Sequence, residues 1–200
     1  MADGTLKVGT ITTSSGSGTI TLGQSGETVT VPSGATLDMT NATMSLNSSM
    51  KNTPAFLATL TADVTLADAV FTTVPWNNIV KDTHNAFDTS NYRFTCPSGN
   101  SGTYYIGGMT ICISGAVTQA SYSDIYLRKN GSNYFYQMSD MRNNHTYQIV
   151  NPFGIFMDLD DGDYVDIQVR LNVTTGTGKI RGNTSPHFES NIYGFRIIGA

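Results

Sequence analysis

The sequence predicts an all-β protein, in which an antiparallel sandwich or jelly roll follows a repetitive N-terminal segment of short strands. Charged residues make up 13% of the 200 residues, against roughly 25% in ordinary globular domains, whereas Gly, Ser, Thr and Asn are abundant. This composition favours strands and turns, because Thr, Val, Ile and Tyr suit strands while Gly, Asn and Ser suit turns. No long stretch carries the 3.6-residue period of an amphipathic helix.

The N-terminal segment repeats a Thr-apolar-Thr motif every nine residues, at Thr10–Thr12, Thr19–Thr21 and Thr28–Thr30. Each repeat offers only one or two apolar side chains, too few to offset an ordering entropy of about 1–2 kcal/mol per residue. We therefore expect the repeats to need neighbouring chains, as in an intertwined three-chain β-stalk. A disordered linker rich in Gly, Ser and Thr is the alternative. The side chains expected to face the three-fold axis are Ile11, Ile20 and Val29.

The residue composition changes near Lys51–Thr53, which marks a predicted domain boundary. Residues 1–50 form the predicted stalk or attachment segment, and residues 51–200 form the predicted head domain. In the head, aromatic residues and longer apolar runs alternate with turn signals, as in sandwiches and jelly rolls. The expected strands span residues 55–61, 69–74, 91–95, 102–114, 122–130, 133–141, 146–157, 163–173 and 187–198.

Two local patterns in the head predict specific structure. Asn130-Gly131 lies between two strand-like runs and predicts a two-residue hairpin turn, because both residue types tolerate positive φ. In Tyr164–Leu171, apolar and polar residues alternate, with Val165, Ile167 and Val169 on one side. This alternation predicts a half-buried antiparallel strand.

Charge and hydropathy argue against two kinds of partner. The formal net charge is −4 and Lys and Arg form no dense run, so we expect no binding to nucleic acid. No stretch approaches the roughly 18 apolar residues of a membrane span, so we expect no membrane insertion. The start of the chain has neither the basic nor the apolar region of a signal peptide, so we expect synthesis in the cytoplasm.

Cys96 and Cys112 are the only cysteines, too few for a disulfide scaffold. Both lie in strand-like segments, where an unpaired cysteine packs as a small apolar residue. We therefore expect both in the core. A disulfide or a reactive thiol is the alternative.

No catalytic constellation is evident in the sequence. His84, His145 and His187 lie far apart in turn-like segments and lack metal-ligand spacing, so we interpret them as exposed loop residues. Nucleophile and phosphate-binding motifs are absent. No acid pair can be assigned to a glycosidase groove, so a polysaccharide-degrading enzyme is the weakest hypothesis. We expect a protein that is not an enzyme.

The densest acidic cluster is a candidate calcium site. Asp160, Asp161 and Asp163 lie in a tight turn, and carboxylate oxygens are the ligands that Ca²⁺ prefers. The EF-hand template fails here, because it would place Met157 and Leu159 at ligand positions. An ordinary acidic β-turn that enters a strand is the alternative.

Three aromatic residues, Trp76, Tyr134 and Tyr136, are candidates for contact with a carbohydrate or a protein receptor. Their side chains combine flat apolar area with a polar tip, which suits both kinds of partner. Successive residues of a strand point to opposite faces, so either Phe135 or both Tyr134 and Tyr136 must face the core.

A series of motifs also runs through the head in a recognisable order. These are Pro54-Ala55-Phe56, Phe71 with Val74 and Asn78, Phe87-Asp88, Phe94–Pro97, Gly102-Thr103-Tyr104, Leu127–Gly131, Leu159–Val165, Tyr193-Gly194-Phe195 and Ile197-Ile198. With them, residues 54–200 resemble the globular-head jelly roll of complement component one, subunit q, which is related to the tumour necrosis factor fold. The resemblance implies a three-fold homotrimer that forms through a large apolar face. Some relatives bind calcium in loops near the trimer axis.

The N-terminal segment departs from that family, because no Gly-X-Y collagen repeat precedes the head. Position 96 is also Cys where the family usually has Ala. Residues 1–50 instead resemble the repetitive opening of bacteriophage tail- or head-fibre proteins. The two resemblances together imply a trimeric virion appendage that binds other virion proteins through its N-terminal segment. Its head would contact a host surface glycan or protein. The alternative is a calcium-assisted, lectin-like or ligand-binding module.

Overall fold

The computed structural model describes residues 9–13, 18–46, 50–115, 119–183 and 189–198. The chain divides into two units, Met1–Ser45 and Leu46–Ala200. The described part of the first unit contains turns and no strand, with the Glu27 amide donating to the Gln24 carbonyl oxygen over 3.1 Å in one of them. The intertwined β-stalk therefore stays a prediction. The boundary predicted from the sequence lies between residues 50 and 51.

The second unit, the head, is built from β-strands. They are β1 (Ala55–Thr59), β2 (Val64–Thr65), β3 (Thr72–Thr73), β4 (Asn78–Asp82), β5 (Phe87–Asp88), β6 (Arg93–Thr95), β7 (Gly102–Ile113), β8 (Ala120–Lys129), β9 (Ser132–Asp140), β10 (Gln148–Leu159), β11 (Tyr164–Val173), β12 (Lys179–Ile180) and β13 (Asn191–Arg196). Within the described ranges no helix is long and apolar enough to cross a membrane.

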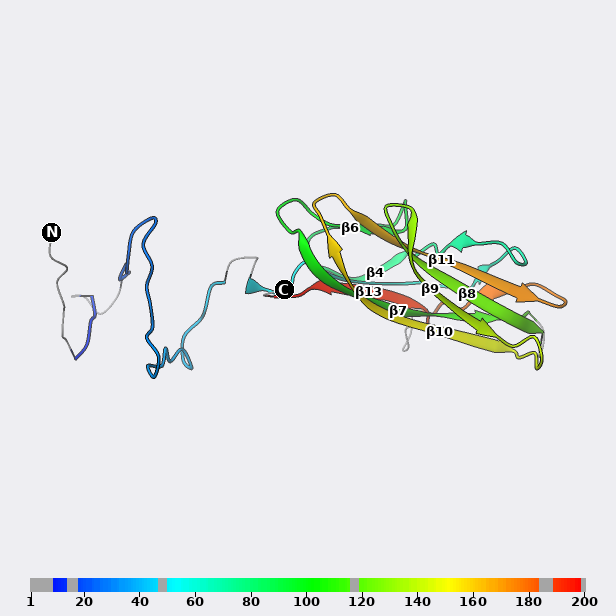
Figure 1. The fold of residues 1–200 in the computed structure, drawn as a ribbon, viewed down its shortest axis with the longest axis horizontal. Helices are drawn as coiled ribbons and strands as arrows, with labels where there is room; N and C mark the ends of the chain where they lie inside the picture. Colours follow the sequence, from blue (N-terminus) through cyan, green and yellow to red (C-terminus); the bar gives the residue numbers. More distant parts are fainter. Residues whose placement is uncertain (1–8, 14–17, 47–49, 116–118, 184–188, 199–200) are drawn as a thin grey trace. The chain divides into compact units, whose positions relative to one another are not determined.

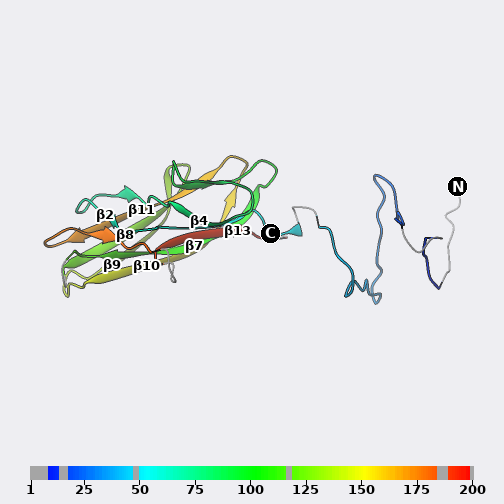
Figure 2. The same ribbon diagram turned by 180° about the vertical axis from the view of Figure 1, so that it is seen from behind.

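The strands form two antiparallel sheets that face each other (Figure 1). Sheet A has the order β2-β12-β7-β13-β1-β4, with β10 paired to the other side of β7. Sheet B has the order β5-β6-β11-β8-β9, with β3 paired to β11. The long strands β9 and β10 each end a sheet, and they lie near each other along one side of the head in both views (Figures 1 and 2). The predicted all-β antiparallel jelly roll is confirmed for the head.

The hydrophobic core fills the space between the two sheets. From sheet B, Val165, Ile167 and Val169 are fully buried, as the alternation in β11 predicted. Sheet A contributes Phe56 of β1, whose ring stacks on Phe94 of β6 with centroids 4.4 Å apart. Such contacts between residues distant in sequence join the two sheets into one domain.

The predicted hairpin is also confirmed, because β8 and β9 pair from Lys129 and Ser132 around Asn130-Gly131. Asn130 and Gly131 have φ angles of 51° and 77°, as a type I′ turn requires. The long strands fall within a few residues of their predicted bounds. The sequence patterns missed the short strands β2, β5 and β12 and the edge strand β4, since such strands are defined by their partners and not by a pattern of their own.

A candidate self-association face

The outer side of sheet A carries an apolar surface at its centre. On β7, Tyr104 and Ile106 are fully buried between the sheets, so Tyr105 points to the outer side. The register places Phe156 of β10 and Phe195 of β13 directly opposite Tyr105, one on each side. Directly opposed residues share a face of the sheet, so three neighbouring strands contribute aromatic rings to the same outer surface.

Tyr105 is the centre of this cluster. Its ring centroid lies 5.3 Å from that of Phe156, 5.7 Å from that of Phe195 and 6.2 Å from that of Tyr193. Burial raises the pKa of the Tyr193 hydroxyl, and its contact with Tyr105 adds to this. We call the four residues Tyr105, Phe156, Tyr193 and Phe195 the aromatic face.

Two glycines in neighbouring strands make room for the Tyr105 ring. Gly107 and Gly154 are paired across β7 and β10. A methyl group on Gly154 would lie 2.3 Å from Tyr105 Oη, and one on Gly107 would lie 2.9 Å from Tyr105 Cε1. Glycine at both positions therefore lets the Tyr105 side chain lie against the sheet.

Much of this apolar surface is open to solvent in the single chain. Phe156 is 62% exposed, Val150 of β10 is 41% exposed and Tyr193 is 37% exposed. Single exposed apolar residues are normal, but a cluster of them on one face of a sheet marks an interaction surface. The aromatic face is therefore the strongest candidate for a functional site in the described part of the head.

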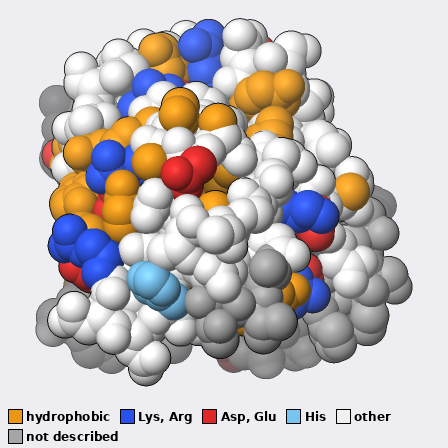
Figure 3. Space-filling view, turned by 90° about the vertical axis from the view of Figure 1, so that its right-hand side faces the viewer, with side chains coloured by type: hydrophobic (Ala, Val, Ile, Leu, Met, Phe, Trp, Pro, Cys, Tyr) orange, Lys and Arg blue, Asp and Glu red, His pale blue; other side chains and the backbone are white. Residues whose placement is uncertain are grey.

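Two hollows are weaker candidates. One, of about 350 Å³, is lined by the loop around His84 and by Thr95 and Pro97, and His84 Nδ1 is hydrogen bonded to Thr83 Oγ1. The other, of about 580 Å³, is lined only by the loop Asp140–Asn144. Figure 3 views the end of the head opposite to the start of β1, where hydrophobic, basic and acidic side chains are mixed. The first hollow gathers His84, Asp88 of β5 and Thr95 of β6, whereas a single loop lines the second.

The proposed role of Trp76 in surface contact is wrong, because its side chain is 0% exposed. The Val74 amide donates to the Ile167 carbonyl oxygen in sheet B, and the Asn77 amide donates to the Thr59 carbonyl oxygen in sheet A. The segment between them crosses from one sheet to the other. Trp76 therefore lies inside the sandwich as part of the core.

Tyr134 and Tyr136 do reach the surface, and each is 48% exposed. Phe135 packs against the core instead, which decides between the two orientations that the sequence allowed. Both tyrosines belong to β9 in sheet B, whereas the aromatic face belongs to sheet A. Their role in ligand contact stays a prediction.

The acidic turn does not assemble a metal site, since the described residues include no group of three or more His, Cys, Asp or Glu side chains that could hold a metal ion. The Asp161 carboxylate accepts hydrogen bonds from the amides of Gly99, Asn100 and Ser101, at 2.7 to 3.2 Å. Asp163 pairs with Lys129 over 2.7 Å and with the Asn130 side chain over 2.6 Å.

The three carboxylates of the predicted calcium site thus have separate surroundings. The Asp160 amide donates to Asp163 Oδ2 over 2.8 Å, which closes the turn. Asp161 holds the loop between β6 and β7, and Asp163 holds the hairpin between β8 and β9. Asp161 and Asp163 therefore connect loops, because backbone amides, Lys129 and Asn130 already engage their carboxylates.

These contacts predict an acid-dependent loss of stability. The hydrogen bond from Lys129 lowers the pKa of Asp163 from 3.8 to about 2, and the Gly99 amide lowers that of Asp161. Groups with a lowered pKa in the folded state stabilise it fully above their ordinary value and lose that effect as the pH falls. We expect the thermal unfolding midpoint to fall between about pH 4 and pH 2, and to fall less steeply in Asp163→Asn. Asn133→Ser, an exposed neutral change on β9, is the control, and parallel curves for Asp163→Asn and the unmodified chain would contradict the assignment.

In the N-terminal unit, Ile11 is 54% exposed, Ile20 is 43% exposed and Val29 is 62% exposed. A single chain thus leaves these side chains without an apolar partner surface large enough to bury them. Their orientation toward a three-fold axis stays a prediction, since the structure holds one chain.

The two cysteines are free and buried, so their expected placement in the core is confirmed. Burial raises the pKa of the Cys112 thiol to about 11, and burial also raises that of Cys96. Of the histidines, His84 is exposed and His145 is half-buried. His187 lies outside the described residues.

Sequence reasoning missed Phe156 and Tyr193 as functional candidates. One available signal was β10 itself, where Val150, Pro152 and Phe156 alternate with the buried Ile149, Phe153 and Met157. A strand with apolar residues on both faces is expected to be covered on both faces.

Two solved structures have a similar fold. The globular domain of zebrafish complement 1qA protein matches with a TM-score of 0.51 and 17% identity, over 72% of this chain and 97% of that domain. Eiger TNF from S. frugiperda matches with a TM-score of 0.51 and 8% identity, over 73% of this chain and 93% of that chain. At such identities the likeness concerns the fold alone. No protein-family model and no curated protein matches the chain.

Proposed function

We propose that the chain is a homotrimeric structural appendage of a virus particle, of the bacteriophage tail- or head-fibre type, whose head contacts the host surface. The observation that carries the proposal is the aromatic face, an exposed apolar surface on a folded head. Burying such a surface against a second copy stabilises an assembly by roughly 25 cal/mol per Å² of apolar area.

The N-terminal unit supports three chains in the assembly. Its Thr-apolar-Thr repeats recur every nine residues, and their apolar side chains are exposed in the single chain. Strands of this kind gain a buried side when identical chains wrap around a common axis. The head and the N-terminal unit thus each lack a surface that sister chains would supply.

The division of labour follows from the two units. The N-terminal unit connects the head to other proteins of the virion, and sheet A of each head faces its sister heads. Sheet B keeps its outer side free for the host surface. A trimer would present three identical sites. Three weak contacts made together give a higher overall affinity than one contact alone.

Purified particles test this proposal. An antibody against the head is expected to label the particles, and excess free protein is expected to reduce their adsorption to host cells. Phe156→Asp is the matched control, since a single-chain competitor loses the advantage of three linked sites. Absence of the chain from purified particles, measured by mass spectrometry, would contradict the proposal.

A further inference from the structure

The outer side of sheet B carries a second group of aromatic rings. Tyr136 of β9 lies directly opposite Tyr126 of β8, and their ring centroids are 5.0 Å apart. Phe71, which precedes β3, lies on the other side of Tyr126 at 4.8 Å. We call Phe71, Tyr126 and Tyr136 the aromatic row. It runs across the strands, so its rings follow the spacing of the sheet.

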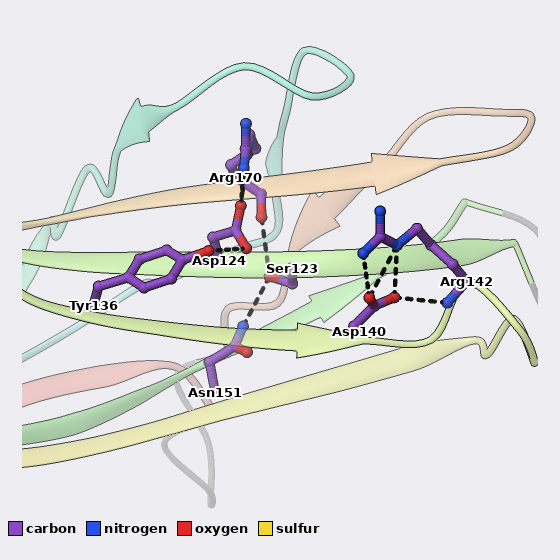
Figure 4. A network of polar contacts seen from close by, with 7 residues as sticks. All are labelled: Ser123, Asp124, Tyr136, Asp140, Arg142, Asn151 and Arg170. Carbon is purple, nitrogen blue, oxygen red and sulfur yellow. Dashed lines mark hydrogen bonds and ion pairs between the residues drawn. The ribbon is translucent and has the colours of Figure 1, made fainter.

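An ion pair between Arg170 and Asp124 contacts this row, and Figure 4 shows it beside Tyr136. Arg170 of β11 donates from Nε to Asp124 Oδ2 over 2.6 Å, and the Asp124 side chain is fully buried. The guanidinium also lies over the Phe71 ring at 4.5 Å and over the Tyr122 ring at 5.2 Å. The Tyr136 hydroxyl donates to Asp124 Oδ1 over 3.2 Å. The rings are thus fixed before any ligand binds, which reduces the entropy lost on binding.

The charges around the row are matched. Arg170 and Asp124 border it on one side, and Arg128 and Asp166 border it on the other, with Arg128 Nε 2.6 Å from Asp166 Oδ1. At the end of β9, Arg142 pairs with Asp140 (Figure 4). Arg128, Arg142 and Arg170 each already have a carboxylate partner. The surface is therefore complementary to an uncharged ligand and offers an anionic polymer little attraction.

The row also differs from the aromatic face of sheet A. Its rings are bordered by ion pairs on both sides, whereas Phe156 of the aromatic face lies beside the Tyr105 ring. Sugars present flat apolar faces edged by hydroxyl groups. Exposed aromatic rings provide the apolar contact, and the partly exposed side chains of Arg128 and Arg170 provide donors for hydroxyl groups.

We propose that the aromatic row binds a neutral polysaccharide. This inference rests on the proposed function for its setting, since the polysaccharide would belong to the host surface. It needs no metal ion. Tyr136 makes the main contact, because it is the most exposed ring of the row.

Affinity electrophoresis of the full chain in gels that contain a soluble glucan, a mannan or a galactan tests the inference, with alginate as the anionic comparison. We expect at least one neutral polysaccharide to retard the protein. Tyr136→Ala should weaken that retardation about tenfold, the loss expected for one ring contact. Tyr136→Phe keeps the ring and should change it by less than about twofold.

Tyr147→Ala is the control, since Tyr147 is a tyrosine with a similar exposed fraction, 44%, that lies outside sheet B and outside the row. Its retardation should equal that of the unmodified protein. Retardation by alginate alone, no retardation by any of the three neutral polymers, or equal retardation of Tyr136→Ala and the unmodified protein would overturn the inference. The solution mass of each variant keeps this outcome separate from the proposed assembly, because a trimer that binds no polysaccharide contradicts only the inference.

Discussion

Phe156→Asp is expected to weaken the proposed association and to shift the equilibrium toward single chains of 21.5 kDa. Phe156 is 62% exposed in the single chain and forms the edge of the aromatic face. Burying a phenylalanine side chain stabilises by about 1.5–3 kcal/mol, and each subunit would lose this contribution. An unpaired carboxylate inside the contact adds a desolvation cost of several kcal/mol. Sedimentation equilibrium at matched concentrations measures the change in mass.

The folded head should survive this substitution, because exposed positions usually change stability by no more than about 0.5 kcal/mol. Tyr134→Asp is the matched control, since it places the same charge at an exposed aromatic position of sheet B. Its mass should equal that of the unmodified chain. A Phe156→Asp protein that associates as tightly as the unmodified chain would exclude the aromatic face as a contact between chains.

Trp76→Ala is expected to lower the free energy of unfolding of the head by about 3–5 kcal/mol. Trp76 is fully buried where the chain crosses between the sheets, so truncation removes its contacts and leaves a cavity. The loss would be a large part of the roughly 5–15 kcal/mol that stabilises a typical domain. Urea unfolding followed by circular dichroism measures it.

The comparison is best made in the Phe156→Asp background, because association makes apparent stability depend on concentration. Trp76→Phe should retain much of the stability, since it keeps an aromatic ring in the core. Tyr134→Ala should change it by less than about 0.5 kcal/mol. A loss below about 1 kcal/mol for Trp76→Ala would contradict its place in the core.

The sequence predicted those features of the head that depend on neighbouring residues. The Asn130-Gly131 turn follows from two residues that tolerate positive φ, and the alternation of Val165, Ile167 and Val169 follows from the two faces of a strand. Both signals lie within a few residues, so one sequence is enough to detect them. The jelly-roll fold was therefore predictable together with its long strands.

The candidate site was not predictable in the same way. Tyr105, Phe156 and Tyr193 belong to β7, β10 and β13, and only the register of these strands brings them together. Trp76 was a candidate contact because its side chain combines flat apolar area with a polar tip, yet its segment crosses the core. The acidic turn looked like a calcium site because its three carboxylates lie within four residues. The amides of Gly99, Asn100 and Ser101, which engage Asp161, come from a distant loop that the local pattern does not show.

The solution mass of the unmodified chain tests the central claim most directly. The two units both leave apolar surface that sister chains would cover, on the aromatic face and along the N-terminal repeats. Sedimentation equilibrium at micromolar concentration is therefore expected to give a mass three times that of the 21.5 kDa chain. A mass of 21.5 kDa under these conditions would contradict both the association of the heads and the three-chain stalk.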